Sequence, residues 1–197
     1  WVLLVEGQSD AIALRALFAD ASEVLRRSLT NHHFVIDHLN GATKLSYKLT
    51  ELQNALCGVH VFLDHDDAGR TAGEAAITDG LLKPIDCHYT TCSGKKNSEW
   101  EDLINPDIYA EYVLANYGVE LKGPAFQNSK IWHDRMAETF LRAGKTWNER
   151  TKTDLKTFVA KAVAASPTSA LNAHQRGSFD NLITALEQKA ATRRDTP

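Results

Sequence analysis

Four short strand-like blocks, separated by stretches long enough to form helices, constrain the fold of this chain more than any other feature. The blocks are WVLLV at 1–5, HFVIDHL at 33–39, VHVFLD at 59–64 and IDCHYTT at 85–91. β-Branched and aromatic residues favour strands, and strands that alternate with helices of about ten or more residues favour a parallel sheet with crossover helices. We therefore predict an α/β fold with a mostly parallel sheet flanked by helices.

The pattern changes after about residue 105, where the chain shows no further strand. Asn105 and Pro106 have the form of a helix cap followed by a first-turn proline, so a helix is expected to begin there. Further helices are predicted over the segments 132–143, 152–165 and 178–191. We therefore expect an α/β domain over residues 1–105 and a small helical domain, packed against it, over residues 106–197.

The composition is that of a globular protein. Hydrophobic residues make up 43% of the 197 residues, which is enough for one substantial core. No run approaches the roughly 18 apolar residues of a membrane helix, and the N-terminus lacks a signal-peptide pattern. The three cysteines, Cys57, Cys87 and Cys92, are too few and odd in number for a disulfide framework, which favours a reducing compartment. We expect a soluble, cytoplasmic protein that has no membrane partner.

The first residues suggest a longer protein. The only methionine is Met136, and Trp1 already belongs to an apolar block that is expected to form a strand. We therefore expect this sequence to be the C-terminal module of something larger.

Acidic side chains directly follow two of the predicted strands. Glu6 closes the first strand, Asp10 opens the helix after it, and DHDDAG at 64–69 closes the third. Ligands gather at the carboxyl ends of strands in open parallel sheets, and carboxylate oxygens are natural ligands of Mg²⁺ and Mn²⁺. The structural alternatives are an Asx-turn with a helix cap at 64–69 and a helix-dipole charge at Asp10. For Glu6 a structural role is harder to find, because a buried carboxylate needs a partner or a metal.

The net charge of −3 argues against a protein that coats nucleic acid by charge alone. It leaves a nuclease open, because acidic metal ligands lower the formal charge and bound divalent ions reverse the sign of the local field.

Together these residues resemble the Toprim pattern, in which one strand ends in Glu-Gly and a later strand ends in Asp-x-Asp with a glycine shortly afterwards. The matching segments are LLVEG at 3–7 and FLDHDDAG at 62–69, so the resemblance covers roughly the first half of the chain. Toprim proteins include primases, topoisomerases, recombination proteins and nucleases. The resemblance implies a compact α/β fold that uses divalent metal on phosphodiester bonds, with Glu6, Asp64 and Asp66 as its signature acidic residues.

Within that superfamily the chain is similar to the overcoming-lysogenization-defect (OLD) nucleases. VEGQSDAIAL, in which Asp10 follows the glutamate by four residues, fits their first motif, and SEWEDLI at 98–104 resembles their later acidic element. In that element the resemblance favours Glu101 and Asp102 as metal ligands, with Glu99 as the alternative. A solvated loop is the structural alternative.

OLD nucleases also carry a helical lobe after the Toprim fold, and a lysine from this lobe joins their active site. The segment TKTDLKTFVAKAVA at 151–164 offers three candidates. Lys152 and Lys156 flank the predicted apolar face of this helix, Lys161 lies farther round, and we favour Lys156. An exposed helix lysine is the structural alternative for all three.

The resemblance implies hydrolysis of DNA by two divalent ions. The residues expected to hold two Mg²⁺ or Mn²⁺ ions are Glu6, Asp10, Asp64, Asp66, Glu101 and Asp102. Lys156 would offset the negative charge that develops on the phosphate. Arg70, Lys95 and Lys96 lie near these loops and are expected to contact backbone phosphates. The resemblance further implies an upstream ABC-type ATPase domain and a role in defence against phage. Whether the protein forms a homo-oligomer through that missing part stays open.

Other functions remain as alternatives. One is a Toprim module that binds DNA or partner proteins as a recombination scaffold without cleavage. Another is a phosphatase that uses Asp64 as a nucleophile, in the manner of haloacid-dehalogenase enzymes. No motif selects one of the five tyrosines as a topoisomerase nucleophile, and Cys87, His88 and Cys92 lack the paired Cys-x-x-Cys spacing of a zinc site.

Overall fold

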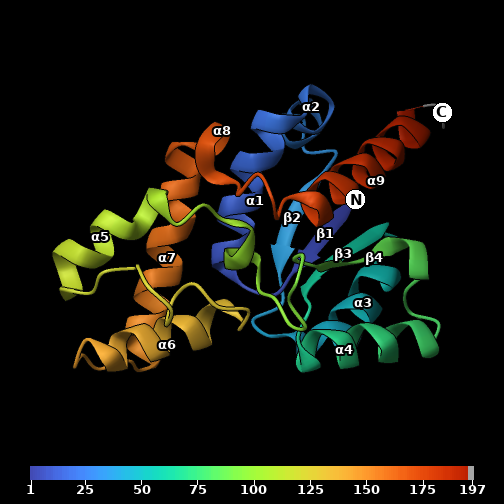
Figure 1. The fold of residues 1–197 in the computed structure, drawn as a ribbon. Helices are drawn as coiled ribbons and strands as arrows, with labels where there is room; N and C mark the ends of the chain where they lie inside the picture. Colours follow the sequence, from blue (N-terminus) through green and yellow to red (C-terminus); the bar gives the residue numbers. More distant parts are fainter. Residues whose placement is uncertain (195–197) are drawn as a thin grey trace.

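A computed structural model describes residues 1–194 and contains a four-stranded, all-parallel sheet in the order β2-β1-β3-β4 (Figure 1). The strands are β1 (Val2–Val5), β2 (Val35–His38), β3 (Val59–Asp64) and β4 (Cys87–Thr90). This confirms the predicted α/β class. Strand β4 starts later than predicted, because the residues just before it form a short 3-10 turn.

Helices separate the strands and make up most of the second half of the chain. In chain order they are α1 (Gln8–Ala21), α2 (Glu23–Thr30), η1 (Ala42–Lys44), α3 (Leu45–Asn54), α4 (Asp67–Thr78), η2 (Pro84–Asp86), η3 (Trp100–Leu103), α5 (Asp107–Tyr117), α6 (Trp132–Arg142), α7 (Glu149–Ala165), α8 (Pro167–Ala170) and α9 (Gly177–Arg194). In the part of the chain described, no helix combines the length and apolarity needed to cross a bilayer.

The two central strands are buried on both faces, which explains why they read as continuous apolar runs. Leu3 and Phe62 point into a core that also contains side chains of α1, α2 and α9. Leu4 and Val61 point the opposite way, into a second core formed with α3 and α4. The sheet is therefore the middle of three layers.

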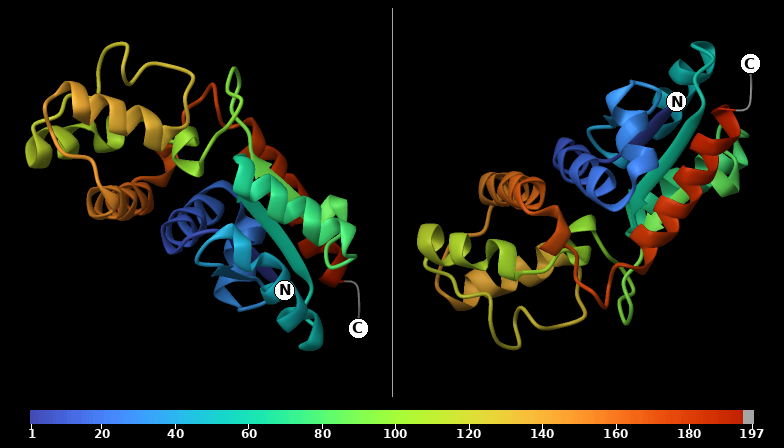
Figure 2. Two further views of the ribbon diagram at one scale, coloured as in Figure 1. Left: turned by 90° about the horizontal axis from the view of Figure 1, so that it is seen from below. Right: turned by 90° about the horizontal axis from the view of Figure 1, so that it is seen from above.

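Helices α5 to α8 form a lobe beside the sheet layer, on the side of α1 (Figure 2). Helix α7 packs along α1, and α5 packs against α7. In the lobe, Trp132 is fully buried, and its indole Nε1 donates a hydrogen bond to the hydroxyl of Tyr109 at 3.1 Å. The lobe shares one continuous core with the α1 face of the sheet, so α7 is held in place against α1.

Helix α9 lies within the range predicted as the helical domain, residues 106–197, but it returns to the sheet (Figures 1 and 2). It packs against β4 and α2. Its Phe179 stacks on Phe18 of α1, with ring centres 5.6 Å apart. Lys189 Nζ also donates to the Asp86 side chain at 2.6 Å. The division at residue 105 stays a prediction, and residues 195–197 of the range lie outside the described residues.

Candidate active site

The strand order creates a switch point between β1 and β3. The chain leaves β1 towards β2 on one side and then crosses to β3 on the other, and ligands bind at the carboxyl ends of strands at such a point. Glu6 directly follows β1, and Asp64 is the last residue of β3. The two residues are in direct contact, because the backbone N–H of Asp64 donates a hydrogen bond to Glu6 Oε1 at 3.0 Å.

Gly69 permits this close approach. A Cβ atom at this position would lie 2.2 Å from the carbonyl oxygen of Asp64 and 3.0 Å from Glu6 Oε1. The first contact is with backbone and cannot be relieved by a side-chain rotation. Glycine is therefore required for α4 to start directly beneath the two strand ends.

Asp10 and Asp66 act as helix caps at the same edge of the sheet. Asp10 Oδ2 accepts from the backbone N–H of Gly7 at 2.9 Å, and Asp66 Oδ1 accepts from that of Gly69 at 2.7 Å. Both residues therefore have the structural role that was the alternative to metal binding: each stabilises the start of a helix. Capping does not remove them from the site. Burial raises the pKa of Glu6 most, and the nearby charges of Asp66 and Asp10 raise it further.

The third acidic segment is joined to β3. The backbone N–H of Trp100 donates to Asp64 Oδ1 at 2.9 Å, which brings η3 against the strand end. Glu99 and Glu101 are buried in this segment, with 5% and 0% of their surfaces exposed. We call Glu6, Asp10, Asp64, Asp66, Glu99 and Glu101 the acidic cluster.

Asp102, predicted to bind metal, is engaged elsewhere. Its Oδ1 accepts from Arg135 Nη2 at 2.6 Å and lies 3.2 Å from Lys95 Nζ. Its Oδ2 accepts from the backbone N–H groups of Glu99 and Trp132. The structure therefore places Asp102 in a separate network that ties the acidic segment to α6.

The residues predicted to contact phosphates differ in availability. Lys95 is held by Asp102 and by the carbonyl oxygen of Lys130, and only 9% of its side chain is exposed. Arg70 pairs with Asp67 and donates to the carbonyl oxygen of His65. Lys96 is exposed beside the same loops.

Lys156 is the lysine that the structure brings into the cluster. Its Nζ lies 3.2 Å from each carboxylate oxygen of Glu101 and 3.7 Å from Glu99 Oε2. Lys152 lies farther out, where its charge still lowers the pKa of Glu99, and Lys161 is exposed. The side chain of Lys156 is only 20% exposed, so its charge is shared mainly with the carboxylates around it.

Burial raises the pKa values of four carboxyl groups in the acidic cluster. It raises the pKa of Glu6 to about 7 and that of Glu101 to about 8, and it also raises the pKa values of Asp10 and Asp64. The charge of Lys156 opposes the shift at each of these groups. Burial acts to lower the pKa of Lys156 itself, but the carboxylates around it raise that pKa well above its ordinary value. One ammonium group does not compensate all of these buried carboxylates.

Glu99 differs from its neighbours because His133 holds it. Burial acts to raise the pKa of Glu99, but the hydrogen bond from His133 and the charge of Lys156 lower it on balance. The sequence offered no motif that selects His133. In the sequence, His133 is distinguished only by its position at the start of a predicted helix. Its partner, Glu99, is 34 residues away along the chain.

The carboxylate oxygens of the acidic cluster are of the type that binds hard divalent cations. They are not arranged around a common point as in a formed metal site. Glu99 Oε2 and Glu101 Oε1 are buried oxygens that accept no hydrogen bond from the residues the structure describes. Within residues 1–194, no three Asp, Glu, His or Cys side chains already converge on one point as a ligand group. The ammonium of Lys156 lies between the carboxylates of Glu99 and Glu101, so those side chains would have to rotate to share an ion.

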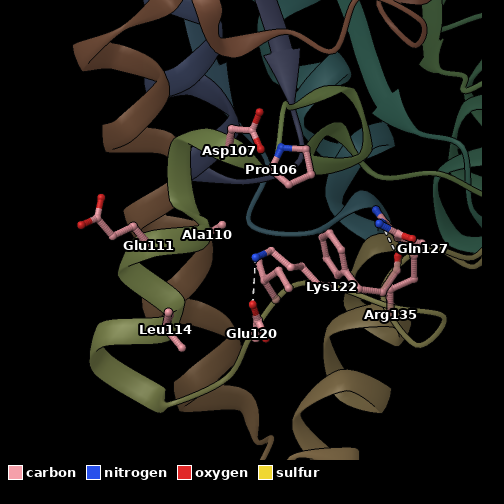
Figure 3. Close-up of a pocket in the computed structure, with 11 residues that line it drawn as sticks. Pro106, Asp107, Ala110, Glu111, Leu114, Glu120, Lys122, Gln127 and Arg135 are labelled. Carbon is pink, nitrogen blue, oxygen red and sulfur yellow. Dashed lines mark hydrogen bonds and ion pairs between the residues drawn. The ribbon is translucent and has the colours of Figure 1, made fainter.

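A cavity of about 620 Å³ lies outside the acidic cluster, between α5, α6 and the segment 120–127 (Figure 3). Its walls are mainly apolar, and Lys122 forms an ion pair with Glu120 at 2.9 Å beside it. Arg135 lines the cavity and also binds Asp102, so the cavity touches the network behind the acidic segment. The cluster carboxylates are not among its lining residues.

The raised pKa values predict that the metal-free protein loses stability as the pH rises. In the unfolded chain, Glu6 and Glu101 lose their protons near pH 4.5, whereas the folded protein holds them to about pH 7 and about pH 8. Between these values the folded state binds more protons, so the free energy of unfolding falls with rising pH. For Glu6 alone the fall is on the order of 3 kcal/mol. Chemical denaturation in EDTA at pH 5 and pH 8.5 measures it.

Glu6→Gln is the matched control for this prediction. Its amide cannot ionise, so the variant should lose less stability than the wild type between the two pH values. A wild type and a Glu6→Gln variant with equal pH dependence would contradict the raised pKa of Glu6.

Comparison of the chain with models of known protein families, with curated proteins and with solved structures gives no match. The acidic cluster and Lys156 are therefore the features from which a function can be inferred. They lie at the switch point of a parallel sheet, where α/β proteins bind their ligands.

Proposed function

We propose that this chain is a divalent-metal-dependent endonuclease that hydrolyses DNA phosphodiester bonds, with a catalytic site of the Toprim kind found in OLD-family nucleases. One observation carries the proposal: carboxylates that follow β1, end β3 and follow β4 meet around a partly buried lysine from α7. Carboxylate-rich sites suit Mg²⁺ and Mn²⁺, the usual ions of phosphoryl transfer.

Each part of the cluster has a distinct task in this proposal. Divalent ions, when bound, supply an activated water and stabilise the charge on the phosphate and the leaving oxygen. Glu6, Asp64 and Asp66 would hold the ions at the switch point, while Glu99 and Glu101 would complete the donor set. Lys156 keeps its positive charge because the surrounding carboxylates raise its pKa, so it can stabilise negative charge that develops on the phosphate.

The test is cleavage of supercoiled plasmid DNA by the purified protein in Mg²⁺, in Mn²⁺ and in EDTA. We expect nicked or linear product with either ion and none in EDTA. Asp66→Asn should lose cleavage, because it removes a charge at the switch point while asparagine still caps α4. Asp67→Asn is the matched control, since the Asp67 side chain is 91% exposed and should not be needed for cutting.

Two results would contradict the proposal: no cutting with either ion, or full activity in Asp66→Asn. A Toprim module that only binds DNA is the second candidate, and the ion pairing of Glu101 with Lys156, which needs no metal, favours it. That module would retain plasmid in a gel-shift assay without cutting it. Hydrolysis of p-nitrophenyl phosphate in place of plasmid cutting would instead indicate a phosphatase.

A further inference from the structure

His133 reaches the acidic cluster from the helical lobe. It is the second residue of α6, and its Nδ1 lies 2.6 Å from Glu99 Oε1. Its Nε2 lies 3.3 Å from Asp134 Oδ1. The Glu99 side chain is 6% exposed and that of His133 is 34% exposed. The imidazole therefore lies between solvent and a buried carboxylate.

The two oxygens of Glu99 have different surroundings. Oε1 is bound by His133, whereas Oε2 has no hydrogen-bond donor within the described part of the chain and lies 3.7 Å from Lys156 Nζ. Holding one oxygen restricts rotation of the whole carboxylate group. The free oxygen is consequently kept on the side of Lys156 and the rest of the acidic cluster.

The backbone that carries His133 is fixed to the segment that carries Glu99. Asp102 Oδ2 accepts from the backbone N–H of Glu99 at 3.0 Å and from that of Trp132 at 3.2 Å. Arg135, one turn into α6, binds the other oxygen of Asp102. The start of α6 therefore cannot shift relative to Glu99 without breaking buried hydrogen bonds.

We infer that His133 is a positioning residue for Glu99, which it holds by one oxygen so that the other can ligate a divalent ion at the acidic cluster. Hydrogen-bond partners of ligating carboxylates orient them in this way in metal sites. The inference rests on the proposed function. It also makes Glu99 a ligand in its own right, whereas the sequence favoured Glu101 and Asp102 and offered Glu99 only as the alternative.

The experiment measures binding of Mn²⁺ alone, without DNA, to the full 197-residue chain. Titration followed by calorimetry or by electron paramagnetic resonance compares the wild type with His133→Leu and His133→Asn. We expect the leucine variant to raise the Kd for Mn²⁺ by about 10–100-fold. The asparagine amide can donate from nearly the same place as Nδ1 and should restore most of the affinity. His174→Leu, at an exposed histidine, is the control and should bind like the wild type.

The outcomes separate the inference from the proposed function. A wild type that binds no Mn²⁺ overturns both. A wild type that binds Mn²⁺, with an equal Kd in His133→Leu, overturns the inference alone. Equal weakening in the leucine and asparagine variants also overturns it, because the N–H donor would then not be the property that matters.

A second measurement uses the wild-type protein, so it does not depend on whether the His133 variants fold. In the wild-type protein, titration with diamagnetic Mg²⁺ should shift the imidazole NMR resonances of His133 and leave those of His174 unchanged. The shift should be absent in Glu99→Gln, which lacks the ionised ligand. A His133 signal that does not respond to Mg²⁺ bound by the wild type would overturn the inference.

Discussion

Replacement of Asp64 by asparagine is expected to abolish metal-dependent cleavage while leaving the fold intact. The asparagine Oδ1 can still accept the hydrogen bond that the backbone N–H of Trp100 donates at 2.9 Å, and the side-chain volume is unchanged. The substitution removes only the charge at the end of β3. Loss of a metal-held charge costs several kcal/mol of transition-state stabilisation, so the nicking rate should fall by about 10³-fold or more. Plasmid nicking at saturating Mg²⁺ measures this.

The stability of the Asp64→Asn variant is its control. Burial raises the pKa of Asp64 well above the ordinary value, which means that the folded protein disfavours the charged form. The asparagine variant should therefore melt in EDTA at the wild-type temperature or above it. Cleavage within tenfold of the wild-type rate would show that Asp64 does not hold the catalytic ions.

Replacement of Lys156 by methionine should strongly destabilise the metal-free protein at pH 8. Methionine keeps the length of the side chain but removes the charge that faces Glu99 and Glu101. Breaking a buried ion pair on one side costs about 3–5 kcal/mol at most, because the remaining charge is left uncompensated. At pH 8 that charge lies mainly on Glu99, since Glu101, with its pKa of about 8, is partly protonated. The loss should be smaller at pH 5, where Glu101, with its pKa near 8, is protonated. Denaturation with urea in EDTA at both pH values measures the difference.

Lys161→Met is the matched control on the same helix. Lys161 is exposed, so this variant should stay within about 0.5 kcal/mol of the wild type. Addition of Mn²⁺ should return part of the stability that Lys156→Met loses, since the ion supplies the missing positive charge. Equal stability of Lys156→Met and the wild type at pH 8 would show that the lysine does not balance the cluster.

The strands and the residues at their ends were predictable because both are local features. β1 and β3 are buried on both faces, so each appears in the sequence as an uninterrupted apolar run, and Glu6 and Asp64 stand where those runs stop. The parallel arrangement then brings the strand ends to one edge of the sheet. A second helix before β2 was not predicted, although Ser22 marks the start of α2, since its hydroxyl accepts from the backbone N–H of Leu25.

The third acidic segment could not be resolved from the sequence because distant residues decide where its side chains point. Asp102 was predicted to bind metal, yet Arg135 and Lys95 draw it into another network. Glu99 points to the cluster because His133 and Lys156 lie there. All four partners are basic side chains, and three of them lie in the lobe, well separated from the segment in the sequence. No local pattern records these pairings.

Through Lys156, the charge balance of the α/β half of the chain depends on the helical lobe that carries α7. The α/β half, produced without α7, would carry several crowded carboxylates with no nearby cation, and in the isolated lobe the ammonium would face water. Each fragment would then lack the interaction that stabilises its contact surface in the intact chain. When the two halves are expressed as separate polypeptides, each should therefore be stable only in complex with the other. Formation of this complex should weaken as salt screens the attraction.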